Sequence, residues 1–233
     1  QSMYTNIDTE HALLVINQWL DDLSDQAKLP PGFPLLPLKQ ALEIVMKNNV
    51  FEFGDTRYLQ LMGTAMGTSS ACMYATIYFA IHEMETLLPR FNRNLIFVRR
   101  YIDDLIAIWA VSDPTTTWDD FCSSLNSFGK LRWDIDEPSS SIDYLDLTIT
   151  ISNGHITTRT YKKEMNLYQY LPPHSSHPPS ALKGMIYSLM RTYSKQNTRR
   201  EDYISTVGFM FHHLLARGWD KVTLKETIIA ADT

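Results

Sequence analysis

The sequence predicts an α+β fold in which antiparallel strands are followed by a helical tail. Short apolar runs joined by turns lie within residues 50–61, 95–109 and 144–161, a pattern typical of β-hairpins. Elsewhere, apolar residues recur three or four positions apart, which is the spacing of amphipathic helices. The tail beyond residue 180 shows only this helical spacing. With 233 residues, 44% of them hydrophobic, the chain can bury a substantial core.

The first quarter of the chain predicts two helices and a hairpin. The expected elements are a helix starting at Asp8 or Thr9 and ending near residue 22, a connector over 29–37, a helix over 38–47, and strands at 50–53 and 58–61. Asp and Thr are favourable N-cap residues. Four prolines in the connector are incompatible with a helix interior. Gly54 and Asp55 favour a tight turn between the two strands.

The middle of the chain predicts a loop, a long helix and a hairpin with two carboxylates at its tip. Small residues make 63–71 a loop, and an apolar segment continues from 72 to 88, where we expect Pro89 to end the helix. Asp103 and Asp104 separate two apolar runs. The hairpin strands are expected at 95–98 and 105–109, a helix at 118–128 and a further strand at 131–135.

The last third predicts a second hairpin and two helices. Residues 144–151 alternate strictly between apolar and polar, so they are expected to form one strand. Asn153 and Gly154 then favour a turn into a strand over 156–161. Apolar residues at helical spacing predict helices over 181–193 and 203–215, the second ending at Gly218. We therefore expect two domains, 1–165 and 166–233.

The overall charge hides an uneven distribution. The chain has 26 acidic and 21 basic residues, a net charge of −5, which argues against a protein that coats nucleic acid or an anionic membrane. Residues 1–154, however, have a net charge of −10, whereas residues 155–225 have a net charge of +7. A basic C-terminal part attached to an acidic body is compatible with binding nucleic acid on one side.

Other features of the sequence exclude several classes of protein. Cys72 and Cys122 lie 50 positions apart without a CxxC motif, so neither a disulfide framework nor a zinc site is expected. No run of about 18 apolar residues predicts a membrane span, and the first residues show no basic stretch followed by an apolar region of the kind found in secretory signals, so we expect no membrane partner. The chain starts with Gln1, which indicates a fragment or a processed product.

Asp103 and Asp104 are the first candidates for chemistry. Adjacent carboxylates between apolar strands must be solvated, paired or bound to cations. Since Asp is also a favoured turn residue, these residues alone leave a plain turn and a metal site equally open. The metal interpretation points to Mg²⁺, which takes one or two carboxylates together with substrate phosphates.

The loop from Gly63 to Gly67 is the second candidate. It lacks the Gly-Lys-Ser/Thr ending of a P-loop and does not match a dinucleotide-binding fingerprint, so by itself a tight connection explains it better. The order and spacing of the features carry more weight. A small-residue loop and helix precede the carboxylate hairpin by about 35 residues, and an alternating hairpin and a helical tail follow it.

With these motifs the sequence resembles the reverse transcriptases of Penelope-like retroelements. The segments that carry the resemblance are Ser2–Ile7, Gly63–Gly67 and Tyr101–Asp104, with further matches at Tyr144–Leu147, Tyr161–Lys163, Tyr170–Leu171 and Ser176–Pro178. They cover nearly the whole chain. The resemblance implies a right-hand polymerase fold, with a palm and part of the fingers in 1–165 and a thumb-like helical subdomain in 166–233.

The resemblance also implies roles for individual residues. Asp103 and Asp104 would be the catalytic metal ligands, for two Mg²⁺ ions or for Mn²⁺. Tyr4 would stack beneath the sugar of the incoming nucleotide. The remaining nucleotide-binding residues implied are Gly63, Ala65 and Gly67, whose backbone would approach the nascent base pair, and Met66, which stands where many reverse transcriptases have Gln.

The implied partners are an RNA template, a DNA primer and deoxynucleoside triphosphates. Tyr144 and Leu145 resemble the element that grips the primer. Basic and polar residues after them would contact nucleic acid, namely Lys162, Lys163, His177, Lys183 and Arg191. A solvated surface is the alternative for the basic residues, and His174 with His177 lacks a third metal ligand. The sequence predicts neither the oligomeric state nor the cellular compartment. An intracellular or nuclear location is compatible with a retroelement enzyme.

Two departures from the family pattern keep alternatives open. The family's first motif has a catalytic Asp about five residues before the position of Tyr4, which falls before Gln1, and Asp8 is better explained as a helix cap. Lys130 is the nearest candidate for a general acid, although an exposed turn explains it equally well. The alternatives are a decayed or domesticated copy that binds nucleic acid or a partner without catalysis, and an unrelated α+β enzyme that binds metal through Asp103 and Asp104.

Overall fold

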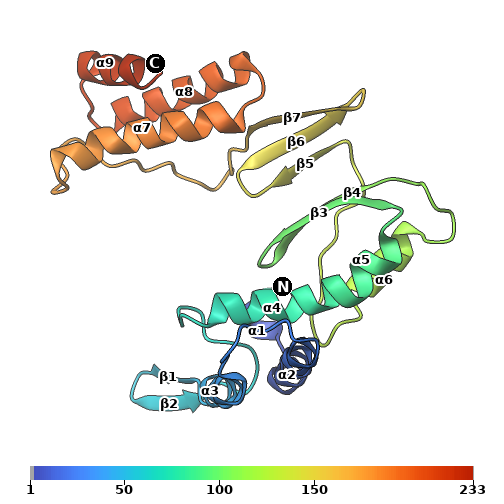
Figure 1. Ribbon diagram of the computed structural model, residues 1–233. Helices are drawn as coiled ribbons and strands as arrows, with labels where there is room; N and C mark the ends of the chain where they lie inside the picture. Colours follow the sequence, from blue (N-terminus) through green and yellow to red (C-terminus); the bar gives the residue numbers. More distant parts are fainter. Residues whose placement is uncertain (1–2, 233) are drawn as a thin grey trace. The chain divides into compact units, whose positions relative to one another are not determined.

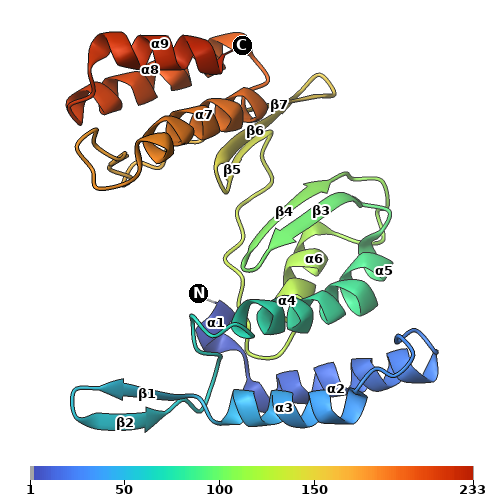
Figure 2. The same cartoon turned by 60° about the vertical axis from the view of Figure 1, so that its left-hand side comes forward.

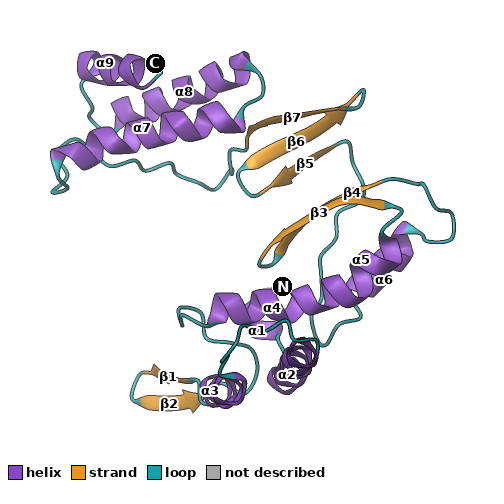
Figure 3. Cartoon of the chain, viewed as in Figure 1, coloured by secondary structure: helices purple, strands orange, loops and turns teal. Residues whose placement is uncertain are grey.

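The computed structural model describes residues 3–232, and its chain forms two compact units (Figure 1). The N-terminal unit comprises Gln1–Glu137 and the C-terminal unit Pro138–Thr233. Both contain helices and small antiparallel sheets (Figure 3), so the α+β class is confirmed. The boundary between the units lies before the expected division at 165/166, because the sheet of residues 141–160 is compact with the C-terminal helices.

The N-terminal unit starts with three helices and a hairpin. These are α1 (Met3–Asn6), α2 (Thr9–Asp25), α3 (Leu35–Lys47), β1 (Val50–Phe53) and β2 (Thr56–Leu59). The predicted cap is confirmed, because the Asp8 carboxylate accepts from the backbone N–H of His11 at 3.1 Å. α3 begins three residues earlier than predicted and includes Pro37, which the first turn of a helix tolerates since its N–H has no intrahelical partner there. The predicted hairpin, which is confirmed, follows α3 (Figure 2).

A long helical segment and a second hairpin follow. The elements are α4 (Ala71–His82), the π-helix η1 (Glu83–Leu87), α5 (Leu88–Phe91), β3 (Leu95–Tyr101), β4 (Asp104–Trp109) and α6 (Trp118–Leu125). The prediction that Pro89 ends the helix was wrong, because Pro89 occupies the first turn of α5, directly after the π-helix. α6 ends at Leu125, earlier than predicted, and Asn126 follows as its C-cap.

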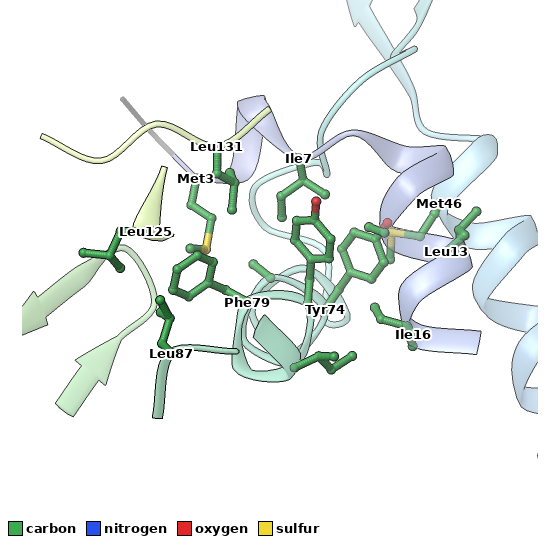
Figure 4. Packing of buried hydrophobic residues seen from close by; sticks show 14 of the residues in the cluster. Met3, Ile7, Leu13, Ile16, Met46, Tyr74, Phe79, Leu87, Leu125 and Leu131 are labelled. Carbon is green, nitrogen blue, oxygen red and sulfur yellow. The ribbon is translucent and has the colours of Figure 1, made fainter. Parts of the chain in front are cut away.

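One buried core holds the N-terminal unit together. Tyr78, Phe79, Phe91 and Phe121 are its large, fully buried side chains. Figure 4 shows Met3, Leu87, Leu125 and Leu131 gathered around Phe79. α2 packs against both α3 and α4, and the apolar side chains of β3 and β4 pack on the same core. α1 and the β3–β4 hairpin are therefore fixed to one scaffold.

The predicted strand at 131–135 does not form. Leu131 is buried, and Trp133 and Ile135 pack against the core, while Arg132 and Asp134 are exposed. The segment thus shows the side-chain alternation of a strand, but no neighbouring strand pairs with it among the described residues. The apolar–polar periodicity of 131–135 therefore predicted the alternate burial correctly. It could not predict that the segment forms no hydrogen bonds with a neighbouring strand.

The C-terminal unit consists of a three-stranded sheet and three packed helices. The elements are β5 (Ser141–Tyr144), β6 (Leu147–Ser152), β7 (His155–Thr160), α7 (Pro179–Gln196), α8 (Arg200–Ala216) and α9 (Lys221–Ala231). α7 contacts both α8 and α9, and α8 contacts β7. The side chains of Ile186, Met190, Met210 and Leu214 form a core separate from that of the N-terminal unit. α9 was not predicted, whereas α7 and α8 were.

The single strand predicted at 144–151 is two strands joined by a tight turn. Tyr144 pairs with Leu147, and Leu145 and Asp146 form the turn between β5 and β6. Leu145 has a left-handed backbone conformation, with φ of 54°. A two-residue turn does not interrupt the apolar–polar alternation, so the sequence pattern did not reveal it. Within residues 3–232, no helix is both long and apolar enough to cross a membrane.

Candidate functional site

The two candidate metal ligands lie at an exposed turn. Tyr101 at the end of β3 pairs with Asp104 at the start of β4, and Ile102 and Asp103 form the turn. Ile102 has φ of 55°, a conformation that β-branched residues seldom adopt. Both aspartates are exposed to solvent. The turn therefore carries two neighbouring aspartates that solvent can reach.

A buried arginine lies beneath this turn. The side chain of Arg100 is only 5% exposed and forms a bidentate ion pair with Glu83 at 2.8 Å. Its guanidinium also donates to the backbone carbonyls of Ile102 at 2.8 Å and Thr76 at 3.0 Å. Arg100 thereby links the β3–β4 turn to α4 and to the π-helix η1. The sequence analysis did not single out either Arg100 or Glu83.

Tyr4 belongs to α1, whose Met3 lines a cavity together with Asp103 and Asp104. The side chain of Tyr4 is half-buried in α1, near the side chain of Cys72 at the start of α4. Burial is the main cause that raises the pKa of Tyr4, followed by the Cys72 contact and by the negative charge of Asp103. The structure thus brings the candidate sugar-stacking residue and the candidate metal ligand together, although 99 positions separate them in the sequence.

Gly63 joins the glycine loop to α1. The backbone N–H of Gly63 donates to the carbonyl of Ile7 at 2.8 Å, and that of Thr64 donates to the carbonyl of Tyr4 at 2.7 Å. A Cβ atom at Gly63 would lie 2.3 Å from the Tyr4 carbonyl oxygen. The requirement for glycine here therefore arises from contact with the chain itself, whereas the sequence analysis attributed it to contact with a base pair.

The rest of the glycine loop is more open. Met66 is 71% exposed, and a Cβ atom at Gly67 would meet nothing within 4 Å, although φ of 97° favours glycine there. The carbonyl of Ala65 accepts from the backbone and the hydroxyl of Thr68, so the loop is braced from within. Gly67 and Met66 are accessible to a ligand, in keeping with the predicted nucleotide-binding surface, whose function stays a prediction.

A cavity of about 340 Å³ adjoins the aspartate turn. Its lining includes Asp103 and Asp104 from the turn, Met3 from α1, and the four residues from Leu131 to Asp134. Arg132 brings a positive charge beside the carboxylates, a combination suited to a ligand that carries phosphates. The segment 131–134 thus belongs to the site, which the sequence analysis expected only to be a strand.

The carboxylate pair suits a hard cation that keeps several of its water ligands. Within residues 3–232, no group of three His, Cys, Asp or Glu side chains is arranged to hold a metal ion. Mg²⁺ is commonly bound by one or two carboxylates, with waters and substrate phosphates as its other ligands. Asp103 and Asp104 fit that pattern, and Mn²⁺ accepts similar oxygen ligands.

Asp8 and Lys130 lie apart from this cavity. Lys130 forms an ion pair with Asp8 at 2.7 Å, and both line a different cavity beside Lys47 and Met62. The hydrogen bond from Lys130 is the main cause that lowers the pKa of Asp8, and the bond from the His11 backbone adds to it. Lys130 is therefore engaged as a structural partner of the helix cap and does not line the cavity at Asp103.

The predicted nucleic-acid contacts are in the C-terminal unit. Tyr144 and Leu145 lie at the β5–β6 turn, and Lys163 pairs with Asp146 of the same turn at 3.8 Å. Lys162 lies over the ring of Phe209, with 4.3 Å between its Nζ and the ring centroid. Burial, followed by the charge of Arg159, lowers the pKa of Lys162.

The other predicted contacts are exposed. Lys183 and Arg191 are exposed along α7, and His177 is exposed in the loop before it, where its Nδ1 is 2.5 Å from the hydroxyl of Ser175. Nothing in these contacts selects between nucleic-acid binding and a solvated surface, so both interpretations of these residues stay open.

Comparison with models of protein families, with curated proteins and with solved structures finds no match to this chain.

Proposed function

We propose that this chain is a reverse transcriptase domain of a retroelement, an RNA-directed DNA polymerase. One observation supports this proposal most. Tyr4, the Gly63 loop and the Asp103–Asp104 turn are three motifs distant in the sequence, and they converge in the N-terminal unit. The reaction would be attack of a DNA primer 3′-hydroxyl on the α-phosphate of a deoxynucleoside triphosphate, with RNA as the template.

The proposal gives each part of the site a task. Asp103 and Asp104 would hold Mg²⁺, which when bound activates the attacking hydroxyl and stabilises the leaving pyrophosphate. Tyr4 would support the sugar of the incoming nucleotide from α1. Arg132 would approach the triphosphate from the other wall of the cavity. The basic residues of the C-terminal unit would bind the phosphates of the template–primer duplex.

The first test removes one carboxylate of the turn. Asp103→Asn, in a chain extended upstream of Gln1 to include the acidic residue that the family pattern implies, should reduce primer extension with Mg²⁺ by about a thousandfold or more, the scale of several kcal/mol of charge stabilisation. Binding of an RNA–DNA duplex, measured by fluorescence anisotropy, should stay within about twofold, because the duplex is bound mainly through its phosphates.

Asp55→Asn is the matched control for this test. Asp55 is also an exposed aspartate in a tight hairpin turn of the N-terminal unit, between β1 and β2, and it has no role in the proposed reaction. Its substitution should leave extension unchanged. Undiminished extension by Asp103→Asn would overturn the proposed function.

A domain that binds nucleic acid without catalysis is the second candidate. It is favoured by the metal-ligand geometry among residues 3–232, where no third His, Cys, Asp or Glu joins Asp103 and Asp104 in a group that could hold a metal ion, although Asp134 lines the same cavity. Duplex binding that persists in an upstream-extended chain without any primer extension, under Mg²⁺ or Mn²⁺, would select this candidate.

A further inference from the structure

We propose that Arg100 is a positioning residue that fixes the direction in which Asp103 and Asp104 present their carboxylates. The inference rests on the proposed function of the aspartate turn. Arg100 does not line the cavity at that turn. Arg100 contacts the backbone of the turn: the Nη1 of Arg100 donates to the carbonyl of Ile102 at 2.8 Å.

The turn needs such support because its backbone is strained. Ile102 is β-branched and has φ of 55°, a conformation that persists only where the surrounding structure enforces it. A hydrogen bond to the carbonyl of Ile102 fixes the peptide plane between Ile102 and Asp103. That plane determines where the Asp103 side chain leaves the backbone.

Arg100 is itself held on several sides. Glu83 accepts from its Nε and Nη2, both at 2.8 Å, and the carbonyl of Thr76 accepts from Nη2 at 3.0 Å. Its guanidinium also lies over the ring of Phe79, 5.1 Å from the centroid. Only a planar guanidinium supplies donors in this forked arrangement, whereas a lysine ammonium has one nitrogen. The anchor is consequently specific for arginine.

The position of Glu83 depends on an irregular feature of the helix. Glu83 is the first residue of the π-helix η1, which interrupts the helical segment between α4 and α5. π-Helical turns in helices occur frequently at functional sites. Here the irregular turn carries the carboxylate that holds Arg100, and its buried ion pair would be costly if either partner were left alone. The π-turn, the ion pair and the aspartate turn form one connected unit.

Arg99 provides a matched contrast on the same strand. It is exposed, its guanidinium lies over the ring of Phe97 at 4.8 Å from the centroid, and it donates to the carbonyl of Val98. It has the same charge as Arg100 and contacts neither Ile102 nor Glu83. Arg99→Gln should therefore change the net charge equally without releasing the turn.

The decisive variant is the double substitution Arg100→Gln with Glu83→Gln. Removing both charges avoids an unpaired buried ion, so the thermal unfolding of the N-terminal unit should stay close to that of the wild type. One amide at position 100 cannot bond the side chain at position 83 and the carbonyls of Thr76 and Ile102 together, so the turn should be released. If the double variant fails to fold, Arg100→Lys takes its place in the measurements. It keeps the positive charge opposite Glu83 and removes the several nitrogen donors of the guanidinium.

Two measurements then test the inference, and the first needs no metal. Amide hydrogen exchange of residues 101–105, followed by mass spectrometry, should become about tenfold faster or more in the double variant, the weight of a hydrogen bond to a charged group. The Mn²⁺ dissociation constant, measured by electron paramagnetic resonance, should rise about tenfold to a hundredfold, as for other residues that orient metal ligands. Arg99→Gln should alter neither quantity.

The outcomes separate this inference from the proposed function. If Asp103→Asn leaves Mn²⁺ affinity unchanged, the proposed metal site fails, and the hydrogen exchange of the turn still decides whether Arg100 holds it. Unchanged exchange in the double variant overturns the inference. So does unchanged Mn²⁺ affinity in that variant when Asp103→Asn abolishes Mn²⁺ binding.

Discussion

At the scale of single residues, His82 is a titratable side chain buried in the core of the N-terminal unit. It is only 6% exposed and stacks on Phe128 at 4.6 Å between ring centroids. Its Nε2–H donates to the carbonyl of Ser124 at 2.9 Å. Burial, which disfavours the charged imidazolium, is the main cause that lowers the pKa of His82. Burial therefore favours the neutral form of His82 in the folded protein.

This lowered pKa predicts a loss of stability in mild acid. The unfolded chain binds a proton at His82 near the ordinary pKa of about 6.5, whereas the folded chain binds it only at a lower pH. The free energy of unfolding should therefore have its full value, as far as His82 is concerned, above a pH of about 6.5. It should decrease as the pH falls through 6.5 towards the lower folded-state pKa. Urea unfolding followed by tryptophan fluorescence measures this decrease, since four of the five tryptophans are in the N-terminal unit.

His82→Phe should flatten the decrease, because it keeps an aromatic ring beside Phe128 and removes the titrating group. The carbonyl of Ser124 would still accept from the hydroxyl of Ser127 at 2.8 Å. His155→Phe is the control, since His155 is exposed on β7. An equally steep pH dependence in His82→Phe would show that His82 does not cause it.

At the scale of elements, the contact between α1 and the glycine loop determines whether the site is assembled. Gly63→Ala would place a Cβ atom 2.3 Å from the Tyr4 carbonyl at φ of 82°. We expect a loss of about 2 kcal/mol or more in the free energy of unfolding, from strain and from displacement of α1. Urea unfolding of the N-terminal unit measures this loss.

Gly67→Ala is the control for the packing part of this effect. Gly67 also has a positive φ, of 97°, but its Cβ would meet no atom within 4 Å. It should therefore lose only the backbone preference for glycine, about 1 kcal/mol. Equal losses in the two variants would mean that the contact with α1 contributes nothing.

Much of the element structure was predictable, since turn residues and helical spacing are local signals. The β1–β2 hairpin, the β3–β4 hairpin and helices α2, α7 and α8 were predicted. The failures were of another kind. The alternation of 144–151 is the same with and without a turn at Leu145, and the burial of 131–135 depends on a core contributed by distant helices.

The candidate site was predicted where motifs are contiguous and missed where they are not. Asp103, Asp104 and Tyr4 stand in recognisable segments. The contact of Arg100 with Glu83, 17 positions away, depends on the packing of a hairpin against a π-helix. The sequence also gives no sign of which of the two adjacent arginines, Arg99 or Arg100, makes this contact. Similarly, the sequence motif included Gly63, but its neighbour Tyr4 is distant in the chain, so the packing reason for glycine was not visible.

At the scale of the whole molecule, charge divides between the two units. The N-terminal unit has 10 basic and 18 acidic residues, a net charge of −8, and the C-terminal unit has 11 and 8, a net charge of +3. The net charge is thus positive in the unit that contains the predicted duplex contacts, while the carboxylates of the cavity are in the other.

This division predicts salt-sensitive binding of an RNA–DNA duplex. Neutralising Lys162, Lys163 and Lys183 to Gln should weaken binding, and the slope of log K against log salt should become shallower by about 0.7 to 0.9 for each phosphate that no longer has a cationic partner. Fluorescence anisotropy at several salt concentrations measures that slope. The control has the same change in charge within the N-terminal unit, at Lys28, Arg57 and Arg93. An equal slope in the two triple variants would contradict a dedicated basic surface.

The two separate cores also have a consequence for the order of folding during synthesis. The buried core residues of the N-terminal unit all lie between Met3 and Leu131, and those of the C-terminal unit lie between Ile186 and Leu224. Domains generally fold as units, the N-terminal one first. Once the chain up to about residue 140 has left the ribosome, the aspartate turn, α1 and the glycine loop have all their core partners. The nascent chain can therefore assemble this site before α7 and the helices after it have emerged from the ribosome.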